Sequence, residues 1–264
     1  MRGGLFFLKV SHYTILMPKL IIANWKMNPA TEAEAVALAE QSDFDNVVLC
    51  PPFPFLEAVR AVVKKAKLGA QDFFWKNPIG PYTGEVSAAE LKGLGVEYAI
   101  IGHSERRLNL GETDEMVARK MATAVKEGLI PILCVGETAE QKEGGDRDQV
   151  LKQEVAVGLS QTLVAINPER YLIYIAYEPI WAISTSESAQ PDNPEDTVSA
   201  VNFIKQVLTE IKSGFNIKFL YGGSVNWRNA DGYLEKPEIE GLLVGGASLV
   251  PEEIKKISGY AKEY

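Results

Sequence analysis

The sequence places three side chains with acid–base chemistry, Lys26, His103 and Glu178, within three residues after the end of a short apolar run. A carboxylate that closes such a run should be partly desolvated, which makes it a stronger base than a solvated carboxylate. A neutral imidazole can donate a hydrogen bond to an oxygen that gains negative charge and can accept one from the same oxygen once it is protonated, and a lysine adds positive charge. Taken singly, each residue is more often structural or solvated. Together, on the rim of one sheet or barrel, they support a chemical role rather than a structural one.

Two later apolar runs end in glycine-rich segments, Gly222-Gly223-Ser224 and Gly245-Gly246. Bare glycines let backbone N–H groups approach an oxyanion closely, and a short helix beginning near Ala247 would add a favourable dipole. A Gly-Gly pair alone is usually a turn, but the last two loops of an α/β barrel often bind phosphate. The segments therefore indicate a phosphorylated substrate.

Eight apolar runs alternate with helix-like segments and must position these residues. The runs are continuously apolar, as expected for parallel strands covered on both faces. No linker or composition shift divides the chain, so the pattern predicts an α/β fold with a single (β/α)8 barrel and leaves an open doubly wound sheet as the alternative. The predicted strands are Leu20–Ala23, Val47–Leu49, Leu68–Ala70, Tyr98–Ile101, Ile130–Val135, Leu172–Tyr177, Ile217–Tyr221 and Leu242–Val244.

Helix signals lie between the runs. N-cap signals predict helix starts at Thr31, Thr113 and Asn193. Glycines predict helix ends at Gly128 and Gly214. Two further helices are expected over Ala58–Lys65 and Gln149–Ile166.

Composition and charge limit the class of protein. The 264 residues include 27 Lys+Arg and 35 Asp+Glu, a net charge of −8, and 46% are hydrophobic. These values describe a folded globular protein and exclude a disordered tail or a basic nucleic-acid binder. No apolar run of about 18 residues predicts a membrane span. The acidic net charge opposes an anionic ligand on average, so backbone N–H groups and a lysine must supply a local positive field.

The N-terminal segment Met1–Leu16 has too short an apolar core for a signal peptide and no cleavage site. We interpret residues 1–16 as an extension, disordered or upstream of a natural start at Met17, and residues 17–264 as one catalytic domain. Cys50 and Cys134 lie on apolar runs. Two buried thiols in a cytoplasmic protein are therefore expected rather than a disulfide.

Seven strings of the sequence, taken in order, resemble the triosephosphate isomerase family: IIANWKMN, YAIIGHSERR, GETDEMV, ILCVGE, IAYEPIWAI, YGGSV and LLVGGASL. They extend from about Leu20 to Leu249. The resemblance implies a TIM barrel enzyme of glycolysis and gluconeogenesis. It implies that the enzyme interconverts dihydroxyacetone phosphate and D-glyceraldehyde 3-phosphate through an enediol(ate), without a metal or organic cofactor.

The resemblance also implies roles for single residues. Glu178 is expected to remove a proton and return it to the adjacent carbon, while His103, as a neutral ring, hydrogen-bonds the oxygens of the intermediate. Lys26 supplies positive charge and Asn24 polarises the oxygen side. Backbone N–H groups expected to hold the phosphate belong to Ser184, Ser224, Gly245 and Gly246. Residues expected to support the site are Ser104, Cys134 and Glu105, the last near Lys26.

The expected lid after Pro179 and Trp181 departs from the family. Where the family usually has AIGTGKTA, residues 182–189 read AISTSESA, so serines replace two glycines and Glu187 replaces a lysine. Ser184 keeps the N–H that should bind phosphate. If closure requires a positive φ there, serine costs about 1 kcal/mol. We expect a working lid with altered closing kinetics.

Segment 71–85 contains four aromatic residues outside any predicted strand. Exposed on a monomer they would form a large apolar patch, which predicts an interface. The resemblance implies that this loop inserts into a second subunit beside Lys26 and His103. We therefore expect an obligate homodimer whose other partner is the phosphorylated triose, with no nucleic acid or membrane.

Two other functions stay open. A different phosphate-binding barrel isomerase, acting on a larger sugar phosphate or an anthranilate derivative, would share the glycines, but the full set of Lys26, His103 and Glu178 argues against it. A non-catalytic homologue that binds a metabolite or a protein is suggested by the altered lid. An isomerase assay with Glu178→Gln separates these functions.

Overall fold

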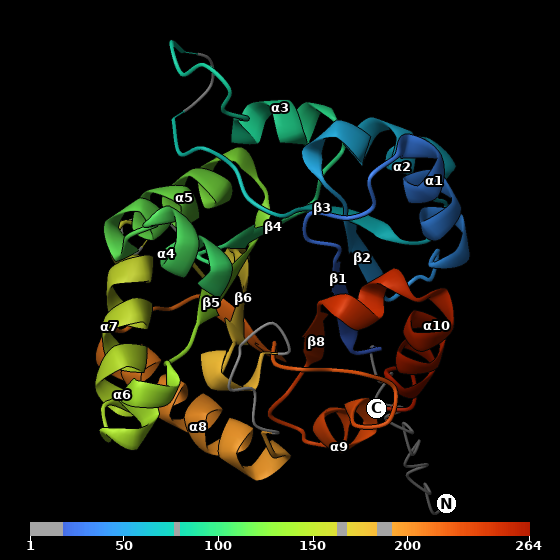
Figure 1. Ribbon diagram of the computed structural model, residues 1–264. Helices are drawn as coiled ribbons and strands as arrows, with labels where there is room; N and C mark the ends of the chain where they lie inside the picture. Colours follow the sequence, from blue (N-terminus) through green and yellow to red (C-terminus); the bar gives the residue numbers. More distant parts are fainter. Residues whose placement is uncertain (1–17, 77–79, 163–167, 184–191) are drawn as a thin grey trace, which may run out of the picture.

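A closed barrel of eight parallel β-strands forms the centre of the computed structural model, which describes residues 18–76, 80–162, 168–183 and 192–264 (Figure 1). Each strand pairs with the next along the chain, and β8 pairs with β1. The predicted barrel is confirmed and the open sheet is excluded. The strands are β1 Leu20–Asn24, β2 Val47–Cys50, β3 Lys67–Ala70, β4 Tyr98–Ile101, β5 Ile130–Val135, β6 Leu172–Tyr177, β7 Asn216–Tyr221 and β8 Gly241–Val244.

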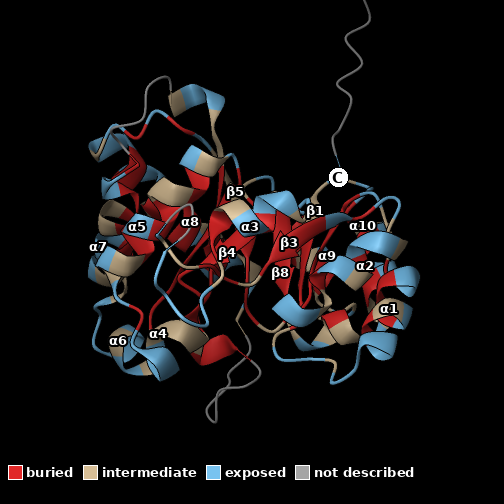
Figure 2. Cartoon of the chain, turned by 90° about the horizontal axis from the view of Figure 1, so that it is seen from above, coloured by how far each residue is buried: buried red, intermediate tan, exposed pale blue. Residues whose placement is uncertain are grey.

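The strand boundaries lie close to the predicted ones. Strands β4, β5 and β6 coincide with the predicted runs, and each of the other five gains one residue. The runs are continuously apolar because both faces are buried. Ile22 and Ile132 belong to the cluster inside the barrel, whereas their neighbours Ile21 and Leu133 pack in the layer between strands and helices. Figure 2 shows the buried strands enclosed by helices with exposed outer faces.

Helices follow the strands and surround the barrel (Figure 1). Within the described residues the α-helices are α1 Glu32–Gln41, α2 Leu56–Val62, α3 Ala88–Gly93, α4 Ser104–Leu110, α5 Asp114–Glu127, α6 Ala139–Glu143, α7 Arg147–Ser160, α8 Pro194–Glu210, α9 Ala230–Leu234 and α10 Pro251–Tyr260. Short 3₁₀ turns are η1 Phe53–Phe55, η2 Pro168–Arg170, η3 Ile180–Ala182 and η4 Gly246–Leu249.

The three helix starts predicted from N-cap signals are confirmed. The side chains of Thr31, Thr113 and Asn193 each accept a backbone N–H from the first turn of α1, α5 and α8. At the other end of α5, Gly128 adopts the left-handed conformation with φ 72°, which a glycine reaches without strain. Local side-chain chemistry therefore determines these three starts and this end.

The helix predicted over Ala58–Lys65 is α2, which begins two residues earlier and stops at Val62. Its early end has a tertiary cause. The Asp43 carboxylate accepts hydrogen bonds of 2.7–3.0 Å from three successive backbone N–H groups, those of residues 64–66. These bonds hold the chain out of the helical conformation as it turns toward β3.

Two other helix ends differ from the prediction. The helix expected over Gln149–Ile166 is α7, which ends at Ser160, and Thr162 donates its hydroxyl hydrogen to the Leu159 carbonyl in the turn that follows. The rest of that predicted range lies outside the described residues. Helix α8 ends four residues before Gly214, whose φ of 66° places it in the next turn rather than at the helix end.

The described residues form one barrel, and the predicted extension, residues 1–16, lies outside them. No helix in the described part of the chain is long and apolar enough to cross a membrane. Cys50 and Cys134 are buried free thiols, as predicted.

Candidate active site

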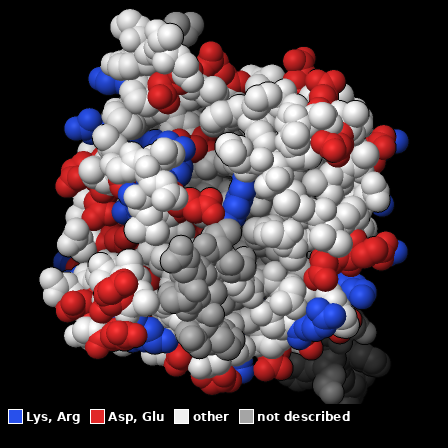
Figure 3. All heavy atoms as spheres, viewed as in Figure 1, with Lys and Arg blue, Asp and Glu red and all other residues white. Residues whose placement is uncertain are grey.

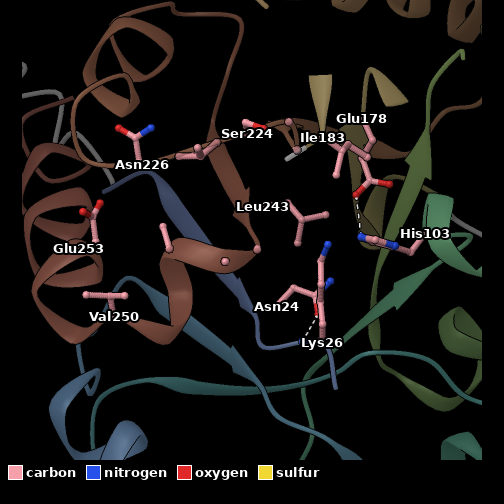
Figure 4. Close-up of a pocket in the computed structure, with 16 residues that line it drawn as sticks. Asn24, Lys26, His103, Glu178, Ile183, Ser224, Asn226, Leu243, Val250 and Glu253 are labelled. Carbon is pink, nitrogen blue, oxygen red and sulfur yellow. Dashed lines mark hydrogen bonds and ion pairs between the residues drawn. The ribbon is translucent and has the colours of Figure 1, made fainter. Parts of the chain in front are cut away.

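A cavity of about 380 Å³ opens at the carboxyl ends of the strands. Figure 3 shows this face of the molecule hollowed near its centre, with acidic and basic side chains on the rim. Figure 4 shows that the lining side chains come from the ends of several strands, from the loops after them and from the start of α10, and that they surround the hollow. The predicted site residues that line it are Asn24, Lys26, His103, Glu178, Ser224, Gly245 and Gly246. Ser184 lies outside the described residues.

Glu178 lies buried at the end of β6 and faces the imidazole of His103 (Figure 4). Its Oε2 atom accepts a hydrogen bond of 3.2 Å from the backbone N–H of Ser104. Its Oε1 atom lies 3.2 Å from His103 Nε2 but accepts no hydrogen bond of good geometry from the described part of the chain. One carboxylate oxygen is therefore anchored, and the other is free to take up a proton.

His103 is the N-cap residue of α4, and its backbone contacts determine which ring nitrogen carries the proton. The N–H of Glu105 donates to Nδ1 over 3.2 Å. A backbone N–H is always a donor, so Nδ1 is the acceptor and carries no proton. The ring is then the neutral tautomer with the proton on Nε2, the nitrogen that faces Glu178.

Lys26 has a strained backbone that directs its side chain into the cavity. Its φ is 53°, a region that residues other than glycine rarely adopt. The strained peptide is held because Asn24 Oδ1 accepts the Lys26 N–H at 3.0 Å and Gln71 donates to the Lys26 carbonyl at 2.7 Å. The Lys26 ammonium makes an ion pair of 2.6 Å with Glu105, the contact that the resemblance implied.

Gly222 and Gly223 pack too closely against their surroundings to carry side chains. A Cβ on Gly222 would lie 2.8 Å from Glu178 Cγ, and one on Gly223 would lie 2.1 Å from the Tyr221 hydroxyl. The 3₁₀ turn η4 begins at Gly246, close to the predicted short helix. These loops thus bring backbone atoms to the cavity wall, where N–H groups can meet an anion.

Ser224 is already engaged in this structure. Its N–H and its hydroxyl both donate to the Ala182 carbonyl, at 3.1 and 2.6 Å. Ala182 ends the turn η3. The N–H of Ser224 can bind a phosphate only when this bond to Ala182 is released.

Cys134 lies inside the barrel on β5, behind Glu178. Burial, and the nearby Glu178 charge, raise the pKa of this thiol well above its usual value. Burial likewise raises the pKa of Cys50. Both side chains are thus neutral thiols that fill space rather than nucleophiles.

Glu137 is a buried residue at this end of the barrel that the sequence reasoning left without a role. Its carboxylate accepts hydrogen bonds from the Tyr177 hydroxyl at 3.0 Å and from Trp181 Nε1 at 2.9 Å. Lys142 Nζ lies 3.3 Å from the centre of the Trp181 ring. The sequence contained a signal for this residue, because Glu137 comes shortly after the apolar run of β5, as Glu178 comes directly after that of β6.

The aromatic residues of segment 71–85 do not form one exposed patch. Phe73 belongs to the core of the barrel and is 1% exposed. Phe74 packs against Trp75 and Tyr82, with ring centroids 4.3 and 4.7 Å away. One of the four rings thus fills the core, and of the three that pack on one another Tyr82 stays 39% exposed, so the exposed aromatic area is smaller than four rings would give. Residues 77–79 lie outside the described residues.

The fold and the cavity define a class of protein. A (β/α)8 barrel that gathers a buried carboxylate, an imidazole, an amine and glycine loops in one cavity at the carboxyl ends of its strands has the arrangement of a barrel enzyme. The sequence profile of one family, Triosephosphate isomerase, matches residues 19–261. The chain belongs to the triosephosphate isomerase family, whose members are aldose–ketose isomerases.

Curated relatives cover nearly the whole chain. The triosephosphate isomerase of Dictyoglomus thermophilum is 41% identical over 247 residues, 90% of this chain and 98% of the relative. That of Caldanaerobacter subterraneus subsp. tengcongensis is 42% identical over 253 residues, 91% and 98% of the two chains. That of Synechocystis sp. is 40% identical over 255 residues, 92% and 99%.

Proposed function

We propose that this protein interconverts dihydroxyacetone phosphate and D-glyceraldehyde 3-phosphate through an enediol(ate), as a cytoplasmic enzyme of glycolysis and gluconeogenesis. The observation that carries the proposal is the buried Glu178 carboxylate, whose Oε1 atom is free of good hydrogen bonds and lies 3.2 Å from the neutral His103 ring. The names of the curated relatives support the same substrate pair.

The proposed reaction moves one proton between two neighbouring carbons. Glu178 takes the proton from the carbon beside the carbonyl group, and the C–H electron pair forms the enediolate while the carbonyl oxygen gains negative charge. The Nε2–H of His103 donates to that oxygen, and the Lys26 ammonium adds positive charge. The proton of the neighbouring hydroxyl group must also move to the former carbonyl oxygen: His103 gives its Nε2 proton to that oxygen and takes one back from the hydroxyl group, which leaves the ring neutral again. Glu178 then returns its proton to the adjacent carbon, and the new carbonyl group forms where the hydroxyl group was. Every step uses groups of this chain.

Phosphate binding is proposed to use the backbone N–H groups of Ser224, Gly245 and Gly246, with Ser184 completing the set. Gly245 and Gly246 line the cavity beside Lys26, and a Cβ on Gly245 would lie 3.3 Å from Lys26 Cε. The bond from Ser224 to the Ala182 carbonyl must break first. Substrate binding therefore requires the segment around Ala182 to move.

We also propose a homodimer in which segment 71–85 of one subunit enters a second cavity of the other. This cavity, about 500 Å³, lies beside Lys26 and His103 and has the exposed side chains of Met27 and Leu110 in its wall. Such exposed apolar side chains around a hollow favour a partner. Sedimentation at micromolar concentration should give the mass of two chains; a fully active single chain would contradict the proposal.

The activity is tested with wild type, Glu178→Gln and a matched control. Glutamine has the shape of glutamate but cannot act as a base, so kcat should fall roughly 10³- to 10⁴-fold with little change in KM. The control, Glu240→Gln, changes a half-buried carboxylate at the opposite end of the barrel, which accepts the Phe219 N–H. It should keep kcat within about twofold.

The alternatives predict different results. A wild-type protein that binds dihydroxyacetone phosphate without turning it over would support the non-catalytic homologue. Activity on a larger sugar phosphate, with none on the triose, would support another barrel isomerase. Full activity of Glu178→Gln would refute the assignment of the base.

A further inference from the structure

Two backbone turns carry the groups that the proposed reaction uses. Gly102 follows the last residue of β4 and immediately precedes His103. Gly136 follows the last residue of β5, and its backbone lies directly against that of Glu178. A Cβ on Gly136 would lie only 1.8 Å from the Glu178 carbonyl oxygen, so the two backbones are in van der Waals contact. Any shift of either turn therefore moves the imidazole or the carboxylate.

Arg107, the second arginine of the string GHSERR, holds the first turn. It lies on α4, and its Nε donates a hydrogen bond of 2.8 Å to the carbonyl of Gly102. Its Nη1 makes an ion pair of 2.5 Å with Asp114, at the start of α5. The side chain is largely buried. A guanidinium fixed at two of its nitrogens is a rigid support for the turn before His103.

Glu154, on α7, holds the second turn. Its Oε2 atom accepts the backbone N–H of Gly136 at 2.8 Å, and its Oε1 atom lies 3.6 Å from Arg107 Nη1. One buried ion pair between α4 and α7 thus joins two backbone anchors. It runs from the Gly102 carbonyl through Arg107 and Glu154 to the Gly136 N–H.

The pair is poorly optimised for stability. Arg107 Nη2 is buried and has no hydrogen-bond partner among the residues that the structure describes. A buried donor without a partner destabilises the fold, and removing two charges from water costs more. Such a pair is better explained by the geometry it maintains than by the stability it adds.

We infer that Arg107 and Glu154 are positioning residues, which hold the turns of His103 and Glu178 at their working separation. The inference rests on the proposed function, because it assigns the pair a use in that proton transfer. A misplacement of about 1 Å at a reacting group costs on the order of 100-fold in rate. Loss of the pair should therefore lower kcat much more than it changes KM.

The first test uses steady-state kinetics on full-length variants. Arg107→Met keeps the side-chain length but removes the donors, and kcat should fall at least tenfold with KM within about twofold. At pH 8, above the pKa of about 7 that burial gives Glu154 in the folded protein, Glu154→Gln keeps the volume and an acceptor for Gly136 but loses the attraction between the ionised carboxylate and Arg107, and kcat should fall roughly threefold or more. The double variant should be no slower than Arg107→Met, because the two residues act as one unit.

A control and a second measurement separate positioning from folding. Lys152 lies on α7, the helix of Glu154, and makes an exposed ion pair with Glu210 at the end of α8. Lys152→Met breaks this pair and should leave kcat unchanged. The chain has two histidines, so ¹⁵N-histidine NMR of the substrate-free protein gives two sets of ring signals, and His12→Gln assigns them. The His103 ring signals should shift in Arg107→Met and Glu154→Gln but not in Lys152→Met.

The outcomes are distinct. Unchanged kcat and unchanged His103 signals in folded Glu154→Gln would overturn the inference, even if Arg107→Met failed to fold. A lower melting temperature with wild-type kcat and signals would show a merely structural pair and overturn it too. An inactive wild type would refute the proposed function, while the His103 signals would still decide whether the pair positions the turn.

Discussion

As the pH rises from acidic to alkaline values, wild type should lose more stability than the Glu154→Gln variant. Burial raises the pKa of this carboxyl group from 4.5 to about 7. The Arg107 charge and the Gly136 N–H oppose the shift, whereas the charges of Asp114 and Glu178 add to it. The folded protein therefore holds a proton on Glu154 at pH values where the unfolded chain has lost it.

The sign and size follow from proton linkage. A group whose pKa is higher in the folded state stabilises the fold below its unfolded pKa, and that stability is lost as pH rises through the folded pKa. Each pKa unit is worth about 1.4 kcal/mol, so a shift from 4.5 to about 7 corresponds to about 3 kcal/mol in total. Between pH 5 and pH 8, wild type should lose about 2–3 kcal/mol relative to Glu154→Gln.

Urea denaturation at pH 5, 6, 7 and 8, at a fixed protein concentration, measures the difference between the two proteins. Titrating groups far from Glu154 are common to both proteins, so their contributions to the free energy of unfolding cancel in the difference. In thermal scans the same effect should move the melting temperatures apart by about 5–10 °C between pH 5 and pH 8. A difference that stays flat across this range would show that Glu154 titrates as a solvated carboxylate, and the reasoning would be refuted.

Three further predictions concern residues around the site. Gly136→Ala should lower kcat roughly 100-fold in steady-state assays, because the new Cβ would meet the Glu178 carbonyl oxygen at 1.8 Å. Trp181→Phe keeps an aromatic ring but removes the N–H that the buried Glu137 accepts at 2.9 Å; urea denaturation should show a loss of about 1–3 kcal/mol. The two buried thiols should react with Ellman's reagent at pH 8 roughly 100-fold more slowly in the native protein than in 6 M guanidinium, and rapid labelling of the native protein would contradict their burial.

The strands could be predicted from the sequence to within one residue because each buries both faces, so its apolar run ends where burial ends. Helix starts were equally local, as at Thr31, where the capping side chain lies three residues from its partner. One helix end, at Gly128, was local as well, but the end of α2 was not. Asp43 ends α2 through contacts made from 21–23 residues away, which no periodicity within the helix contains.

The candidate site likewise has residues that the sequence predicts and contacts that it does not. The positions of polar residues directly after strands predicted that His103 and Glu178 share one site, and both line the cavity. The pair of Arg107 and Glu154 could not be predicted, because it joins helices 47 residues apart in a contact that only the packing of α4 against α7 creates. The bond from Ser224 to Ala182 is equally invisible, because a backbone donor has no residue type to signal its partner.

The charges in the cavity show how an acidic protein of net charge −8 can bind a phosphorylated substrate. Among the described residues that line the cavity, Lys26 is the one basic side chain, while Glu178 and Glu253 are both acidic. Lys26 is moreover paired with Glu105 at 2.6 Å. Side-chain charge therefore cannot supply the attraction for a dianionic phosphate. Backbone N–H dipoles of the glycine loops that line the cavity, such as those at Gly245 and Gly246, are therefore needed to supply it.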